Sequence, residues 1–178
     1  SAITHNIFTY DYTVMDGVAI KASYVPSHTT GAVEGSVDYG VKLTPSQIEG
    51  LTVYAALGEN NDAANSADVS MMAVIYASGP LSVGYQVNET DFGTGSSDED
   101  FTAVGVSYAL TDDLSVSVNT SVIDYEASSK DDQEAQAVSF SHTSGGMTIS
   151  GTYGTMDNVA GTGTADNAAY ELNFKFAF

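Results

Sequence analysis

The feature that most limits the fold of this chain is an alternation of apolar and polar residues that restarts about every 33 positions. Five segments begin with a turn residue and continue in this pattern, at residues 17–20, 50–53, 80–83, 113–116 and 146–149. Their first apolar residues are 33, 30, 33 and 33 positions apart. Period-two alternation places successive side chains on opposite faces of a strand, and a fixed spacing requires a repeated supersecondary unit. Each unit holds two strand-like runs, which does not match a four-stranded propeller blade.

This pattern predicts an all-β chain of eleven strands joined alternately by short and long connections. The expected strands are 3–14, 18–25, 33–43, 51–60, 68–78, 81–89, 100–110, 114–125, 133–143, 147–156 and 169–178. The long connections are mostly polar and fall at 26–32, 61–67, 90–99, 127–132 and 157–168. Strict alternation of this kind is typical of an up-and-down antiparallel transmembrane β-barrel, with short turns at one rim and long loops at the other. The Greek-key crossings of a soluble sandwich would break it.

Composition excludes several other classes of protein. The apolar residues, 43% of the chain, never form the run of about 18 that a membrane-spanning helix needs. The chain has 23 acidic residues against four lysines and carries a net charge of -19, so it cannot neutralise the phosphates of nucleic acid. The absence of cysteine rules out disulfides and thiolate metal sites within this sequence.

The last predicted strand gives the clearest assignment of its two faces. Five large apolar side chains share one face: Tyr170, Leu172, Phe174, Phe176 and Phe178. Such a row would promote aggregation in water, whereas the lipid-facing wall of a barrel requires it. Tyr12, Tyr76 and Tyr108 each precede a tight turn by a few residues, which predicts an aromatic girdle at one membrane interface.

This closing strand, with its terminal Phe178, resembles that of the general diffusion porins of the Gram-negative outer membrane. Residues 6–10 followed by 17–26 resemble the hairpin after the inward-folded third loop of that family. The resemblance covers the whole chain and implies one β-barrel domain over 1–178, the C-terminal portion of a homotrimeric barrel of about 16 strands. It implies a water-filled channel through which small hydrophilic solutes and ions cross passively. A structural or surface-binding barrel with a closed lumen is the alternative.

Eleven is an odd number, whereas single-chain bacterial barrels have even numbers of strands. Unpaired strand edges in hydrocarbon cost several kcal/mol for each unsatisfied group. We therefore expect the N-terminal strands and the constriction loop to come from outside these residues, in the same polypeptide or as a separate fragment.

The other face of the strands supplies the candidate pore lining. Its polar members are Asp11, Lys21, Ser23, Asp38, Lys42, Gln86, Asn88, Asn119, Glu171 and Lys175. In the family, basic wall residues face acidic residues of the third loop across the pore, and the resemblance gives that role to Lys21, Lys42 and Lys175. Anchoring at lipid headgroups is the alternative for lysines at strand ends.

The acidic residues gather near the predicted long loops, which favours a preference for cations. Oxygen-rich clusters also suit Ca²⁺, with Asp98, Glu99, Asp100, Asp131 and Asp132 as candidate ligands, although no calcium-loop spacing is present. Solvated loops are the simpler interpretation, and no other cofactor is expected. The three histidines are scattered, and no nucleophile, base and carboxylate occur in a recognisable spacing, so the sequence does not predict an enzyme. A soluble adhesin or lectin is a third alternative, against which the closing strand argues.

Overall fold

The computed structural model describes residues 7–27, 33–62, 66–93 and 98–177. They form one sheet of eleven strands, each antiparallel to its neighbours in sequence, in the order β1 to β11. The predicted up-and-down meander is therefore confirmed. The strands are β1 (Phe8–Met15), β2 (Val18–Val25), β3 (Val33–Leu43), β4 (Leu51–Asp62), β5 (Ala67–Ser78), β6 (Leu81–Asp91), β7 (Glu99–Thr111), β8 (Leu114–Tyr125), β9 (Gln133–Ser144), β10 (Met147–Asp157) and β11 (Asn167–Phe176).

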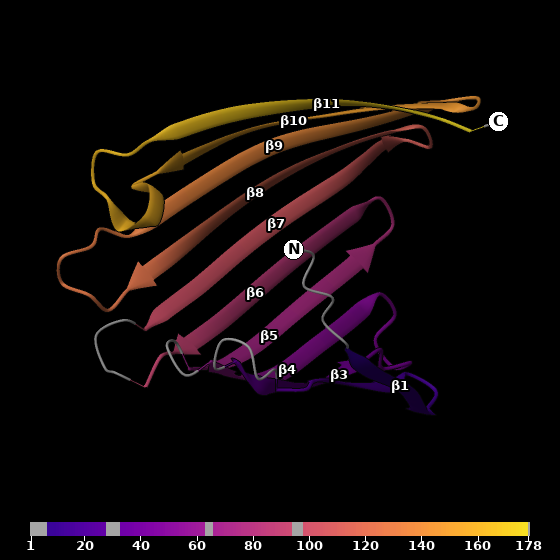
Figure 1. The fold of residues 1–178 in the computed structure, drawn as a ribbon. Coiled ribbons are helices and arrows are strands. Elements are labelled where there is room, and N and C mark those ends of the chain that lie inside the picture. Colours follow the sequence, from indigo (N-terminus) through magenta and orange to yellow (C-terminus); the bar gives the residue numbers. More distant parts are fainter. Residues whose placement is uncertain (1–6, 28–32, 63–65, 94–97, 178) are drawn as a thin grey trace.

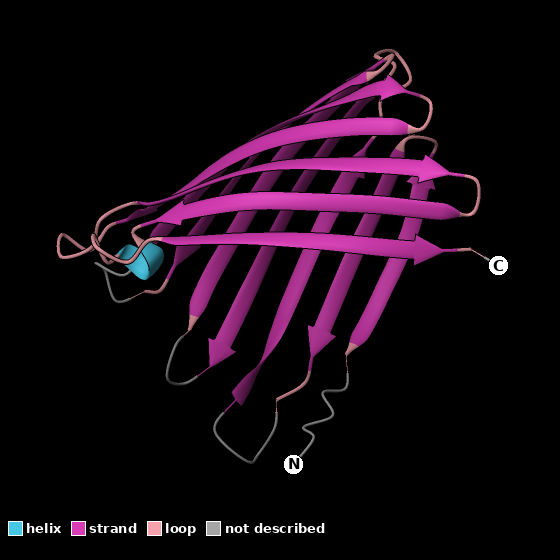
Figure 2. Ribbon diagram, turned by 90° about the horizontal axis from the view of Figure 1, so that it is seen from above, coloured by secondary structure: helices cyan, strands magenta, loops and turns pink. Residues whose placement is uncertain are grey.

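The sheet curves into a trough, with β1 and β11 at its two edges (Figure 1). This curvature follows from the right-handed twist that accumulates from strand to strand. The short turns and the C-terminal end of the chain lie at one rim, and the long connections lie at the other (Figure 2). Within the described residues the sheet does not close, since β1 pairs only with β2 and β11 only with β10. An open sheet is what part of a barrel would show.

The 33-residue repeat corresponds to a repeated backbone contact at the short-turn rim. Gly17 and Gly50 adopt φ of 77° and 83°, a left-handed conformation that residues with a side chain rarely adopt. The carbonyl oxygen immediately before each of five strands accepts a hydrogen bond from a backbone N–H near or just after the end of the following strand. These bonds are Thr44 N to Gly17 O (2.7 Å), Ala77 N to Gly50 O (3.0 Å), Ala109 N to Pro80 O (2.9 Å), Thr143 N to Asp113 O (2.9 Å) and Ala177 N to Gly146 O (2.7 Å). These bonds continue the pairing of neighbouring strands into the short turns.

The sheet is one layer thick and does not enclose an apolar core. Among the described residues, only Ala67 and Ala73 are buried apolar side chains. By contrast, Tyr170 is 86% exposed and Phe174 is 57% exposed. No helix in the described part of the chain has the length and hydropathy to cross a bilayer. A sheet of this kind reaches stability only if its apolar face is covered by something outside the described residues.

Two local features differ from the sequence-based expectation. The connection predicted at 157–168 contains a short 3-10 helix, η1 (Val159–Gly161). Bulges at Thr13–Met15 and Ala109–Thr111 interrupt the pairing near two tight turns, so Val14 and Leu110 have no register partner, although both lie within the predicted strands 3–14 and 100–110. The predicted start of the first strand at residue 3 lies outside the described residues.

Candidate functional site

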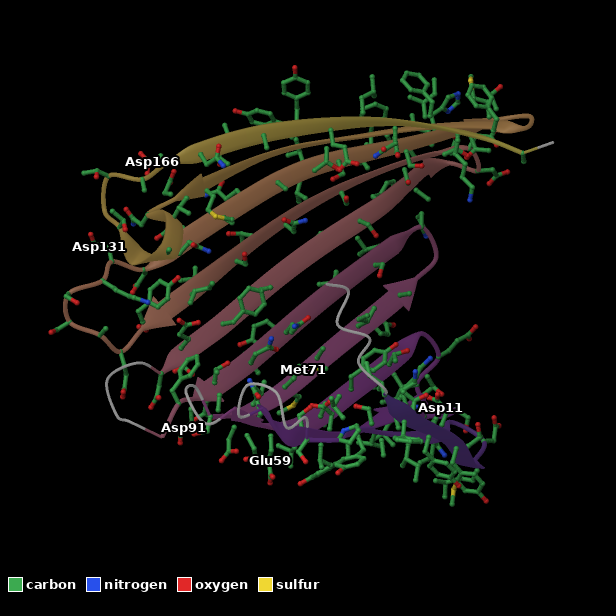
Figure 3. All side chains as sticks on the ribbon, in the orientation of Figure 1. Asp11, Glu59, Met71, Asp91, Asp131 and Asp166 are labelled. Carbon is green, nitrogen blue, oxygen red and sulfur yellow. The ribbon has the colours of Figure 1, made fainter. Side chains whose placement is uncertain are left out.

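Cross-strand pairing defines two faces that continue across the whole sheet, because directly opposed residues point to the same side. One row runs from Asp11 through Lys21, Gly40, Ala56, Met71, Asn88 and Phe101 to Ile123. Met71 points into the trough, whereas Glu59 points away from it (Figure 3). We call the side bearing Met71 the concave face and the side bearing Glu59 the convex face.

All ten polar residues predicted for the pore lining lie on the concave face. Pairings connect Asp11 with Lys21, Ser23 with Asp38, and Lys42 with Tyr54. Further along the sheet, Gln86 and Asn88 lie opposite Ala73 and Met71, Asn119 lies opposite Gly105, and Glu171 and Lys175 lie opposite Thr152 and Thr148. The register therefore brings these residues to one surface, although they come from six strands.

Four charged residues of β1 to β3 have local partners on this face. Lys21 Nζ lies 3.0 Å from Asp11 Oδ1, and both side chains are largely exposed. Ser23 Oγ donates a hydrogen bond of 2.7 Å to Asp38 Oδ2, and the Asp38 carboxylate also lies against Gly58. Lys42 Nζ is 5.8 Å from the centre of the Tyr54 ring, within reach of a cation–π contact. An exposed ion pair contributes only about 0–1 kcal/mol, so the Asp11–Lys21 pair matters more for local charge than for stability.

Hydroxyl groups dominate the concave face from β6 to β10, a feature that the sequence analysis missed. One cross-strand row contains Ser82, Ser107, Ser117, Ser139 and Thr152, and the next contains Ser115, Ser141 and Ser150. Ser139 Oγ lies 2.9 Å from Thr152 Oγ1, and Thr143 Oγ1 lies 3.0 Å from Thr148 Oγ1. The serines at alternate positions of β8, Ser115 and Ser117, could have indicated this hydroxyl-rich surface. These small side chains give a polar wall that does not fill the trough.

The concave face has one apolar region. β5 is apolar on both sides, and the register assigns Val69, Met71, Ala73 and Ile75 to the concave face. Phe101 and Ile123 extend this region onto β7 and β8. Since Phe101 lies directly opposite Asn88, this region borders amide groups rather than forming a separate surface.

The convex face carries the apolar row predicted for the closing strand. Tyr170, Leu172, Phe174 and Phe176 share it on β11, with Phe174 and Phe176 57% and 56% exposed. Phe178, the fifth predicted member, lies outside the described residues. Tyr12, Tyr76 and Tyr108 also lie on the convex face, on strands that lead into short connections. Neither row turns towards the trough.

Many of the acidic residues near the long loops lie at the ends of strands, and six of them form two rows on the convex face near the long-loop rim. The predicted strand limits already included five of these six, all except Asp91. Asp68 is directly opposite Glu59 and Asp91, and Asp100 is directly opposite Glu89 and Asp124. The strands extend further than predicted because acidic residues at strand ends still pair through their backbone. This placement removes much negative charge from the mouth.

The five candidate calcium ligands do not converge. Glu99 lies on the concave face and Asp100 on the convex face, and the Asp98 carboxylate accepts a hydrogen bond of 3.0 Å from Phe92 N. Within 7–27, 33–62, 66–93 and 98–177, no three acidic, histidine or cysteine residues lie close enough to hold a metal ion. Asp131 and Asp166 lie at the long-loop rim (Figure 3).

A family model described as Gram-negative porin matches residues 1–178. The fold is similar to that of the anion-selective porin from Comamonas acidovorans, with a TM-score of 0.76 and 13% identity over 97% of this chain and 59% of that one. For the loop L8 deletion mutant of Vibrio cholerae OmpT, the TM-score is 0.73, with 21% identity over 97% of this chain and 63% of that one. For the outer membrane channel DcaP of Acinetobacter baumannii, the TM-score is 0.70, with 14% identity over 98% of this chain and 62% of that one. The chain thus spans about three fifths of each, and no curated protein matches it.

Proposed function

The chain belongs to the Gram-negative porin family, and we propose that it forms the greater part of the wall of a water-filled channel for passive diffusion of small hydrophilic solutes and ions. As a porin it is a protein of the cell outer membrane, and its family consists of channels rather than enzymes. One observation carries the proposal. A single-layer sheet exposes large apolar side chains on its convex face and charged, amide and hydroxyl groups on its concave face.

Each face fits a different surrounding. Tyr170, Leu172 and Phe174 would be costly in water, at about 25 cal/mol for each Å² of apolar surface, and contact with lipid removes that cost. The pairs Asp11–Lys21 and Ser23–Asp38 would be costly in lipid, and water in a channel solvates them. The proposed partners of the two faces are therefore outer-membrane lipid and the aqueous solutes.

The complete channel requires more strands than this chain supplies. The backbone groups along the outer edges of β1 and β11 need partners, because the bilayer provides none. We propose that further N-terminal strands of the same barrel, with the constriction loop, close it at about 16 strands, and that three barrels form a homotrimer. Barrels of about 8 strands fill with side chains, whereas those of 16–18 leave an aqueous lumen. Eleven strands that curve without meeting support the wider class.

We further propose a preference for cations. The net charge is -19, and the concave face carries Asp11, Asp38, Glu99 and Glu171 against Lys21, Lys42 and Lys175. The excess on this face is small, since most acidic residues lie elsewhere, so we expect a weak preference. The similar porin from Comamonas acidovorans is described as anion-selective, a property of that protein.

The decisive experiment is conductance of the full-length protein, purified from its source membrane, in a planar bilayer. The proposal predicts that the current rises in steps as single channels insert. When the KCl concentration differs across the bilayer, the reversal potential should have the sign that indicates a higher permeability for K⁺ than for Cl⁻. Detergent carried through a mock purification is the control. Folded, inserted protein without steps would contradict the channel and favour the closed-lumen alternative. Steps with the opposite reversal potential would overturn only the ion preference.

A further inference from the structure

The last two long connections fold against each other at the long-loop rim. Asp131 N donates a hydrogen bond of 3.1 Å to Gly161 O, and Asn158 Nδ2 donates one of 2.8 Å to Asp132 O. The short helix η1 lies beside β9 at this rim (Figure 2). The 126–132 and 158–166 connections are therefore one folded unit rather than two independent loops.

This unit is turned towards the concave face. Ala160 N donates a hydrogen bond of 2.8 Å to Oε1 of Gln133. Gln133 is directly opposite Ile123, which belongs to the same row as Phe101 and Asn88, so its side chain lies on the concave face. The 158–166 connection consequently reaches over the end of the wall, into the space that a channel mouth would occupy.

Lys130 joins this unit to the wall. Its aliphatic carbons pack against Gly161, where an added Cβ would lie 2.7 Å from Lys130 Cβ and 2.8 Å from both Cγ and Cδ. Its Nζ lies 4.0 Å from the centre of the Tyr125 ring and 3.8 Å from Glu99 Oε1. Glu99 and Tyr125 are directly opposite each other on the concave face. The side chain thus spans from the folded connections to the inner wall.

Lys130 also differs from the other lysines in its electrostatic surroundings. Lys21 and Lys42 lie on β2 and β3, and Lys175 lies near the short-turn end of β11. The connections near Lys130 contain Glu126, Asp131 and Asp166. Glu99 and Tyr125 hold its ammonium in a region of negative charge. The ammonium is therefore a fixed positive charge that repels cations and attracts anions near the channel mouth.

We propose that Lys130 is a selectivity-determining residue, which holds the 158–166 connection at the channel mouth and weakens the preference of that mouth for cations. The selectivity part rests on the proposed function, whereas the structural link does not. A unit charge about 10 Å away in water changes the local concentration of a monovalent ion about twofold, in opposite directions for cations and anions. Removing it should therefore raise the cation-to-anion permeability ratio about two- to fourfold at low salt, and less at high salt.

Three variants of the full-length protein separate charge from packing. Lys130→Met keeps the aliphatic contact with Gly161 and removes the ammonium. Lys130→Ala removes the ammonium and the Cγ and Cδ atoms that lie against Gly161, and leaves only Cβ. Lys175→Met is the matched control, because it makes the same chemical change at the opposite rim. The measurements are reversal potentials in planar bilayers and hydrogen exchange of the amides of Asp131, Ala160 and Gly161.

We expect Lys130→Met to shift the reversal potential towards cations while amide protection is largely kept. Lys130→Ala should give that shift, a larger conductance and faster exchange at 160–161, and Lys175→Met should leave exchange at these amides unchanged. Unchanged exchange in Lys130→Ala would overturn the structural link. An unchanged reversal potential in Lys130→Met, with a conducting wild type, would overturn the selectivity role. Failure of the wild type to conduct would instead reject the proposed function, and the exchange measurement would still test the link.

Discussion

The contact of Gly151 with Phe140 on the convex face allows a quantitative test of the register between β9 and β10. The two residues are directly opposite, and Gly151 also lies opposite Leu172 of β11. A Cβ at position 151 would lie 2.6 Å from Phe140 Cε1 and 3.1 Å from Cζ, with Glu171 O at 3.4 Å. Carbon atoms prefer about 3.5–4.0 Å, so Gly151→Ala forces the ring to move by about 1 Å.

The expected change in the free energy of unfolding for Gly151→Ala is the sum of two opposing effects. The atoms met are at the far end of the Phe140 ring, which is 42% exposed and can turn outwards, so the clash should cost about 1 kcal/mol, the lower end of the range for overpacking. Alanine in the middle of a strand recovers roughly 0.5–1 kcal/mol relative to glycine. Gly105→Ala is the matched control for the second term, because a Cβ there would meet no atom nearer than Asn119 Cβ at 3.7 Å. The difference between the two variants should therefore be about 1 kcal/mol.

The assay is equilibrium unfolding of the full-length protein from lipid vesicles in urea, followed by circular dichroism. Phe140→Leu removes the ring atoms that clash, so Gly151→Ala should cost less in that background, and a double-mutant cycle gives the coupling. Equal stabilities of Gly151→Ala and Gly105→Ala, or no coupling with Phe140→Leu, would refute the reasoning.

Two further predictions concern charge. Asp68→Asn removes the middle carboxylate of the row Glu59–Asp68–Asp91 and so relieves repulsion between like charges. It should stabilise the protein by about 0.2–1 kcal/mol at low salt and by less at high salt. Urea unfolding of the protein in vesicles at both salt concentrations checks this, and a loss of stability would contradict it. Lys21→Met leaves the Asp11 carboxylate uncompensated and should shift the reversal potential towards cations, whereas Lys21→Met with Asp11→Asn should restore the wild-type value; a double variant as shifted as the single one would argue against the pairing.

Local patterns predicted the strands well. The limits of β2 and β8 agree with the alternation, because a turn glycine or an aspartate pair marks one end of each strand. The closing strand was equally clear, since one face is entirely apolar from Tyr170 to Phe176. The period of two was enough to place Asp11, Lys21 and the other candidates on one face.

Features that depend on contacts between residues far apart in the sequence could not be predicted from local patterns. The helix η1 includes Ala160 at φ 57°, a conformation supported by the bond to Gln133, 27 positions away. Lys130 was not singled out, because its partner Glu99 comes from another hairpin. Asp91 and Glu99 were placed in a predicted connection because polarity was taken as a loop signal, although the backbone at both positions pairs as strand.

The most direct test of the account compares two neighbouring positions on β11, Asn173 on the concave face and Phe174 on the convex face. The sequence contains no cysteine, so Asn173→Cys and Phe174→Cys each introduce one thiol into this part of the protein. The full-length variants, inserted in lipid vesicles, are treated with a water-soluble maleimide, and quenching by brominated lipid of a fluorophore on each thiol is measured separately. The account predicts rapid maleimide labelling at 173 with little quenching, and slow labelling at 174 with strong quenching. The reverse result, or equal behaviour at the two positions, would contradict it.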